Sequence, residues 1–168
     1  MSDQRKHLRK IAFAGVFAAF IFLGTEIHVP TAIGHVNLGD LIILVSSYIL
    51  GPFAAIPAAI GSALADLLAG YAQYVAPTFM IKGLMGLVAG LIMRRKPHDK
   101  VSLPRKLIAA VTAEAIMIAG YFAFESLPFM YGVTAAIGSL VPNLIQAAAA
   151  IIGAIPLTYI KSFNNVRV

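Results

Sequence analysis

The sequence contains no cysteine and few charged residues. Without cysteine, the chain has no disulfide bonds, no thiol catalysis and no Cys-ligated metal site. Only 12% of its 168 residues are charged, while 60% are hydrophobic. A water-soluble domain of this length has too little interior to hide that much apolar surface. Lipid can replace the missing core, so we expect an integral membrane protein with a single membrane domain over residues 1–168.

Acidic residues are especially scarce, with seven Asp and Glu against 13 Lys and Arg and a net charge of +6. Such an excess of positive charge is typical of nucleic-acid-binding proteins. Here, however, the basic residues flank apolar stretches and form no face interleaved with aromatic side chains. The positive-inside rule of membrane proteins explains this distribution better, so we expect no nucleic-acid partner.

Twelve of the 13 basic residues fall into three clusters: Arg5, Lys6, Arg9 and Lys10, then Arg94, Arg95, Lys96, Lys100, Arg105 and Lys106, then Lys161 and Arg167. Basic clusters accumulate on the cytoplasmic side, which places both termini and the middle cluster there. An even number of spans must then lie on each side of the middle cluster. Because a span needs about 20 residues, four fit before it and two after it.

The fold class predicted in this way is an all-α integral membrane protein with six transmembrane helices and cytoplasmic N- and C-termini. The second span is too short to cross a full bilayer without help from its neighbours. The expected spans cover approximately residues 11–27, 40–50, 53–70, 76–93, 104–124 and 134–160.

Lys82 and Glu114 stand inside the apolar stretches, where an ionised side chain costs about 2.5–3.5 kcal/mol. One interpretation is structural: Lys82 forms an ion pair with Glu114 or with Asp66 that ties helices together. The other is functional, a polar cavity that opens to the outside and binds a small polar molecule. The amides of Asn143 and Gln146 at matching depth favour the cavity.

A substrate-binding site in the outer half of the protein follows from this second interpretation. Its tyrosines are expected to stack on a flat ring, and its polar groups to hydrogen-bond the substituents of that ring. The four His residues show no metal-ligand spacing, no catalytic constellation stands out, and no phosphate-binding GxxxxGK loop occurs. We therefore expect neither an enzyme nor a cofactor. The candidate binding residues are Asn37, Asp40, Tyr74, Lys82, Glu114, Tyr121, Asn143, Gln146 and His35.

Small residues four positions apart recur along the expected helices, as in Ala14 and Ala18, Gly15 and Ala19, and Gly86 and Gly90. Such spacing allows helix backbones to approach closely, either within the bundle or against another membrane protein. On the first span these small residues come just after the basic N-terminal cluster. We interpret Ala14, Ala18, Gly15 and Ala19 as a docking face for a partner.

Several longer stretches resemble the substrate-specificity (S) components of energy-coupling factor (ECF) vitamin transporters. The similarity extends from about Arg9 to Ile160 and is greatest to the riboflavin-type branch, which includes hydroxymethylpyrimidine and pyridoxine carriers. It is carried by the segments Val36–Ile43, Gly61–Tyr71, Pro77–Gly86, Glu114–Phe122 and Pro142–Gln146.

This resemblance implies a six-helix S-component fold in the bacterial cell membrane, with a vitamin site near the outer face. It also implies that Ala14 and Ala18 dock onto a transmembrane coupling (T) protein, which carries two ABC-type ATPases. Hydroxymethylpyrimidine or a pyridoxine-type vitamer is the expected ligand, with riboflavin as the alternative. The thiamin branch relies on a tryptophan that this chain lacks, so intact thiamin is disfavoured.

Two other classes of membrane protein remain open from the sequence. A self-sufficient secondary transporter would use Lys82 and Glu114 as a proton or ion relay, and inverted repeats would favour it, but none is visible. A small integral membrane enzyme would need a catalytic constellation, and none rises above chance.

Overall fold

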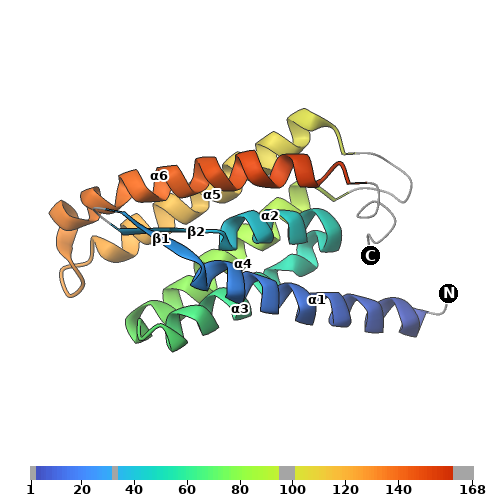
Figure 1. Cartoon of the computed structure of the whole chain (residues 1–168), viewed down its shortest axis with the longest axis horizontal. Helices are drawn as coiled ribbons and strands as arrows, with labels where there is room; N and C mark the ends of the chain where they lie inside the picture. Colours follow the sequence, from blue (N-terminus) through green and yellow to red (C-terminus); the bar gives the residue numbers. More distant parts are fainter. Residues whose placement is uncertain (1–2, 32–33, 95–100, 161–168) are drawn as a thin grey trace.

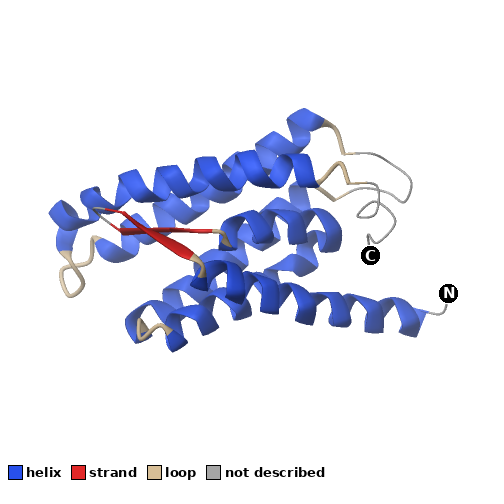
Figure 2. Cartoon of the chain, in the orientation of Figure 1, coloured by secondary structure: helices blue, strands red, loops and turns tan. Residues whose placement is uncertain are grey.

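The computed structural model describes residues 3–31, 34–94 and 101–160. These residues form a bundle of helices that run roughly along one long axis, with a short β-hairpin near one end (Figures 1 and 2). The elements are α1 (Asp3–Glu26), β1 (His28–Thr31), β2 (Gly34–Asn37), α2 (Gly39–Leu50), η1 (Gly51–Ala54), α3 (Ala55–Leu68), η2 (Ala72–Tyr74), α4 (Val75–Ile92), α5 (Leu103–Glu125) and α6 (Gly132–Leu157), where η marks a 3-10 helix.

Five segments of the described chain are long and apolar enough to cross a membrane: His7–Glu26, Gly39–Leu68, Ala72–Ile92, Leu103–Glu125 and Gly132–Leu157. The second segment contains both α2 and α3, between which the chain turns back (Figure 1). The prediction of a helical, multi-pass membrane protein is confirmed. Six crossings stay a prediction, because α2 has 12 residues and spans only about 18 Å of a hydrocarbon core about 30 Å thick.

Helix α2 lies in the interior of the bundle, between α1, α4 and α6. Every residue of α2 from Ile43 to Leu50 is buried, which fits a helix whose apolar residues surround its whole circumference. It begins near the middle of the long axis of the bundle (Figure 1). Its first turn therefore places Asp40, which is fully buried, deep inside the protein.

The β-hairpin occupies the segment between the first and second expected spans, for which no strands were predicted. Its antiparallel register pairs His28 with Asn37 and Val29 with Val36. Strand β2 packs on α6, where the backbone N–H of Asn37 donates to the side-chain carbonyl of Gln146 at 3.1 Å. The hairpin thus ties the first connecting segment to the last helix of the bundle.

The two ends of the bundle differ in charge. Helices α1 and α5 begin at one end, and α4 and α6 finish there (Figure 1). This end carries Arg5, Arg9 and Lys10 of α1, and Arg105 at the start of α5 donates to the carbonyl oxygens of Ile92 and Arg94. The basic residues Arg95, Lys96, Lys100, Lys161 and Arg167 lie outside the described residues.

Helix α4 packs directly on the turn that joins α2 to α3. Gly51 in that turn has a φ of 61°, which favours glycine. A Cβ atom added at Gly86 would lie 2.8 Å from the carbonyl oxygen of Ala54, and one added at Gly90 would overlap the backbone of Gly51. The Gly86–Gly90 spacing therefore serves packing within the chain.

Gly90→Ala is accordingly predicted to destabilise the protein by about 1–3 kcal/mol, because the backbone at Gly51 must move to admit the methyl group. Thermal unfolding in detergent, followed by circular dichroism, measures the effect. Gly15→Ala is the matched control, since a Cβ there meets nothing within 4 Å. Equal melting temperatures for the two variants would contradict the packing argument.

Candidate functional site

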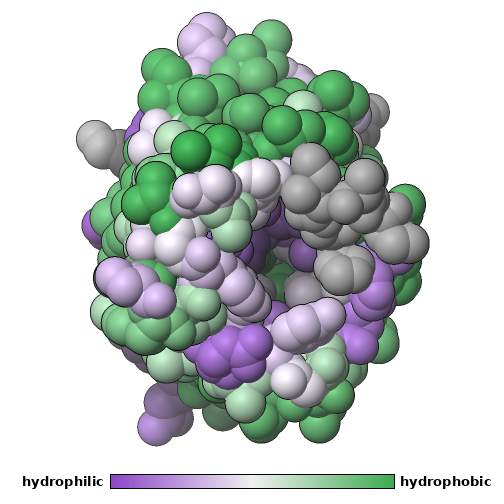
Figure 3. Space-filling view, turned by 90° about the vertical axis from the view of Figure 1, so that its left-hand side faces the viewer, coloured by the Kyte–Doolittle hydropathy of each residue, from purple (hydrophilic) through white to green (hydrophobic). Residues whose placement is uncertain are grey.

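A cavity of about 430 Å³ opens at the end of the bundle opposite the basic residues. Viewed from that end, hydrophilic residues surround a central hollow, whereas the sides of the bundle are largely hydrophobic (Figure 3). Every α-helix except α2 contributes to the lining, together with the hairpin and η2. The polar and aromatic lining residues are Thr25, Glu26, His28, Asn37, Ser62, Asp66, Tyr71, Tyr74, Thr78, Lys82, Tyr121, Glu125, Tyr131, Ser139, Asn143 and Gln146.

A buried hydrogen-bond network centred on Asp40 lies at the inner end of this cavity. The ammonium group of Lys82 donates to one carboxylate oxygen of Asp40 at 2.5 Å, and the amide of Gln146 donates to the other at 2.6 Å. All three residues are at most 5% exposed. The carboxylate is thus satisfied by α4 on one side and by α6 on the other.

The ion pair of Lys82 is therefore formed with Asp40, and not with Glu114 or Asp66, the two partners that the structural interpretation of the sequence considered. Asp40 can pair with Lys82 because α2 is short and begins at the same depth as Lys82. If the second span were full-length, Asp40 at its start would lie at the membrane surface. The Lys82 ammonium also lies 5.3 Å from the centre of the Tyr121 ring, within cation–π range.

Glu114 is buried, at 2% exposure, behind the lining of the cavity. Neither of its carboxyl oxygens has a hydrogen-bond partner among the described residues. It lies close enough to Asp40 and Lys82 to interact electrostatically with both. The inner end of the cavity thus combines one ammonium group with two carboxyl groups.

Aromatic rings form one wall of the cavity, centred on Tyr74. Its ring centre lies 5.4 Å from that of Phe124, 6.3 Å from Tyr121, 6.4 Å from Tyr71 and 6.5 Å from Tyr131. The hydroxyl of Tyr74 donates to Glu125 at 3.1 Å, and the hydroxyls of Tyr121 and Thr78 are 2.9 Å apart. These bonds hold the hydroxyl groups of Tyr74 and Tyr121 in place.

Comparison with known proteins identifies the family. A family model described as "ECF-type riboflavin transporter, S component" matches residues 5–162. The chain belongs to this family of ECF S components. It is also similar to a Pyrococcus woesei protein described as "Uncharacterized protein in gap 3'region", with 29% identity over 128 residues, 76% of this chain and 82% of that protein.

The family assignment confirms the resemblance read from the sequence, at the level of the ECF S component. The family consists of the substrate-binding components of transporters and is not an enzyme family. No three His, Asp or Glu side chains in the described part of this S component are grouped as metal ligands would be.

Six of the nine candidate binding residues line the cavity of this S component: Asn37, Tyr74, Lys82, Tyr121, Asn143 and Gln146. Asp40 and Glu114 lie behind the lining. The backbone of His35 belongs to β2, but its side chain lies outside the described part of the structure.

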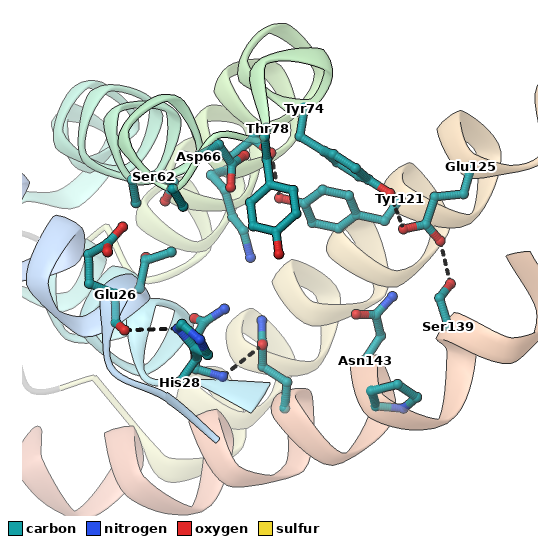
Figure 4. A pocket seen from close by; sticks show the side chains of 18 of the residues that line it. Glu26, His28, Ser62, Asp66, Tyr74, Thr78, Tyr121, Glu125, Ser139 and Asn143 are labelled. Atoms are coloured by element: carbon teal, nitrogen blue, oxygen red, sulfur yellow. Dashed lines mark hydrogen bonds between the residues drawn. The ribbon is translucent and has the colours of Figure 1, made fainter. Parts of the chain in front are cut away.

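Sequence reasoning left several lining residues out of the candidate site, notably Glu26, Ser62, Glu125 and Ser139 (Figure 4). Glu125 accepts from the hydroxyl groups of both Tyr74 and Ser139. A pattern signal did exist for one pair: Ser62 and Asp66 stand four residues apart, which places them on one face of a helix. Glu26 and Glu125 lie at helix ends. A charged residue at that position is expected at the end of any membrane span, so it does not indicate a binding site.

The buried pair of Lys82 and Asp40 yields a stability prediction. Lys82→Met should cost about 3–5 kcal/mol, because it leaves a buried carboxylate without its counter-charge, and the double variant Lys82→Met/Asp40→Leu should recover most of that loss. Thermal unfolding of the single and double variants in detergent provides the measurement. A double variant whose loss equals the sum of the two single losses would refute the pairing.

Proposed function

We propose that this S component captures a small vitamin or vitamin precursor at the outer face of the cytoplasmic membrane for ATP-driven uptake. A hydroxymethylpyrimidine or pyridoxine-type ring is the favoured ligand. The observation that carries the proposal is the polar, tyrosine-walled cavity at one end of an otherwise lipid-compatible bundle. Its volume of about 430 Å³ falls in the usual range of about 300–1,000 Å³ for small-molecule sites.

The orientation of the cavity follows from charge. The basic residues at the start of α1, Arg94 just after α4 and Arg105 at the start of α5 mark the cytoplasmic end. The cavity opens at the other end, which faces outward under the same rule. A binding subunit that collects nutrients from outside the cell requires this orientation.

Ligand recognition is proposed to combine stacking with hydrogen bonds. Tyr74 and Tyr121 offer ring faces, and Asn37 and Asn143 offer amide groups from two sides of the cavity. Lys82 and Gln146 keep their bonds to Asp40 and present their remaining donors to the ligand. Glu114 acts from behind the lining, through its electrostatic interaction with Lys82.

Coupling to ATP hydrolysis is proposed to occur through α1 and a T protein with its two ABC-type ATPases. On α1, Gly15 and Ala19 are exposed and Ala18 is partly buried. Ala14, by contrast, is only 7% exposed. The partner surface is therefore assigned to Gly15 and Ala19 with the edge of Ala18, while Ala14 packs inside the bundle.

Reconstitution tests the proposed function. Vesicles that contain this chain with a T protein and the two ATPases should accumulate radiolabelled pyridoxine or hydroxymethylpyrimidine only when ATP is enclosed. Vesicles with this chain alone should show binding without accumulation, whatever ion gradient is applied. Accumulation by the chain alone down a proton or sodium gradient would instead establish the secondary transporter.

Replacing Gly15 or Ala19 with Trp should reduce co-purification of the T protein by about tenfold or more, because a large side chain keeps the helix backbones apart. Ligand binding by the isolated variant should be unchanged. Ile152→Trp, at a site on α6 that is 73% exposed, is the matched control and should co-purify normally. If Gly15→Trp and Ala19→Trp also co-purify normally, α1 is not the docking face.

A further inference from the structure

The cavity contains more negative than positive charge. Three carboxylates line it, from Glu26, Asp66 and Glu125, against the single ammonium group of Lys82. That ammonium already pairs with Asp40. His28 also lines the cavity, and its Nδ1–H donates to the backbone carbonyl of Glu26 at 2.9 Å.

This concentration of carboxylates is unusual for the chain, which has only seven acidic residues in total. Five of them line the cavity or lie directly behind it: Glu26, Asp40, Asp66, Glu114 and Glu125. Among the described side chains, the basic ones other than Lys82 lie at the opposite end of the bundle. The cavity therefore presents a negative potential to any entering molecule.

Two polar groups on the cavity face of α3 lack a full set of hydrogen-bond partners among the described residues. Ser62 is 1% exposed and lines the cavity, yet its hydroxyl has no hydrogen-bond partner among the described residues, and neither has one oxygen of Asp66. The two residues are one helical turn apart and point to the same side (Figure 4). Buried polar groups of this kind are normally hydrogen-bonded, so the pair is suited to accept a ligand N–H group.

Glu26 of α1 adds a second carboxylate to this site. It lies close enough to Asp66 for the two negative charges to repel each other. A positive group placed between them would remove the repulsion and gain charge-assisted hydrogen bonds. Four tyrosines, Tyr71, Tyr74, Tyr121 and Tyr131, also line the cavity, and the face of a tyrosine ring attracts a cation through its quadrupole.

Resting on the proposed function, we infer that the ligand is a small organic cation. Its protonated nitrogen is bound by Asp66, Ser62 and Glu26, and its ring or alkyl part packs on Tyr74 and the neighbouring tyrosines. Among the candidate ring classes, this selects molecules with a protonated amino substituent over their neutral hydroxyl counterparts. Phosphorylated vitamers are excluded by charge.

Matched probe pairs test this inference at neutral pH by calorimetry on the purified chain. Pyridoxamine is compared with pyridoxine, and aminomethylpyrimidine with hydroxymethylpyrimidine, because each pair differs in an ammonium group that replaces a hydroxyl. The cationic member of at least one pair should bind about tenfold tighter or more. Tighter or equal binding of the neutral members, or of pyridoxine phosphate, would overturn the inference.

Variants of Asp66 and Glu26 test where the ammonium group of the ligand binds. Asp66→Asn and Glu26→Gln should each weaken binding of the cationic probe by about tenfold and leave the neutral probe within about threefold, since the shape of the site is preserved. Arg5→Gln, which changes the charge of an exposed side chain at the other end of α1, is the control and should change neither. Equal losses for both probes, or no loss for either, would contradict a cation site between Asp66 and Glu26.

A capture experiment separates this inference from the proposed function. The ligand-free chain is incubated with yeast extract, washed, and its bound small molecules are identified by mass spectrometry. Capture of a cationic heterocycle or amine supports both proposals. Capture of a neutral or anionic vitamin retains the proposed function and overturns the inference, whereas capture of nothing contradicts both.

Discussion

The buried carboxylate of Asp40 is the constraint on which this structure depends. Moving an ionised group out of water costs several kcal/mol, and the protein recovers that cost only if partners surround the charge. Lys82 and Gln146 supply one bond to each oxygen, and Gln146 also accepts from the backbone of Asn37. This chain of bonds joins α4, α2, α6 and β2. It sets the depth at which α2 begins, and with it the position of the inner end of the cavity.

The polarity of the whole molecule is organised around this network. Large apolar side chains such as Leu68, Met80 and Ile152 are more than 70% exposed on the outside, whereas the interior cavity is polar. That arrangement is unstable in water and suitable in lipid, where exposed apolar surface has no cost. Because the sides of the bundle must stay apolar, charge is confined to the two ends and to the cavity. The described basic side chains other than Lys82 occupy one end, and five of the seven acidic residues gather in or behind the cavity that opens at the other.

The sequence predicted the helices well because apolar stretches, separated by charge clusters and by Gly and Pro, are a strong one-dimensional signal. Lys82 was singled out for the same reason, as the one basic residue inside such a stretch. What it could not predict was the pairing of Lys82, because that depends on how far α2 extends, a property set by packing against α1, α4 and α6. The β-hairpin was missed because its eight strand residues carry little alternation. Glu26 and Glu125 were missed because a carboxylate at a helix end has the same sequence context whether it faces a cavity or solvent.

Lys82 forms the ion pair with Asp40 and also lines the cavity, where it can contact a ligand. The ion pair limits which ligand groups can bind at the inner end of the cavity. A lysine ammonium has three donors, one of which is committed to Asp40. A ligand that displaced Asp40 from Lys82 would leave a fully buried carboxylate with only Gln146 as partner, at a cost comparable to breaking a buried ion pair. A ligand that accepts from one of the other two donors incurs no such cost. Acceptor groups of the ligand are therefore expected at Lys82, as additions to the existing pair, and its donor groups near Asp66 and Glu26. Opposite ends of the same molecule would then be recognised by opposite charges, which fixes the direction in which it enters.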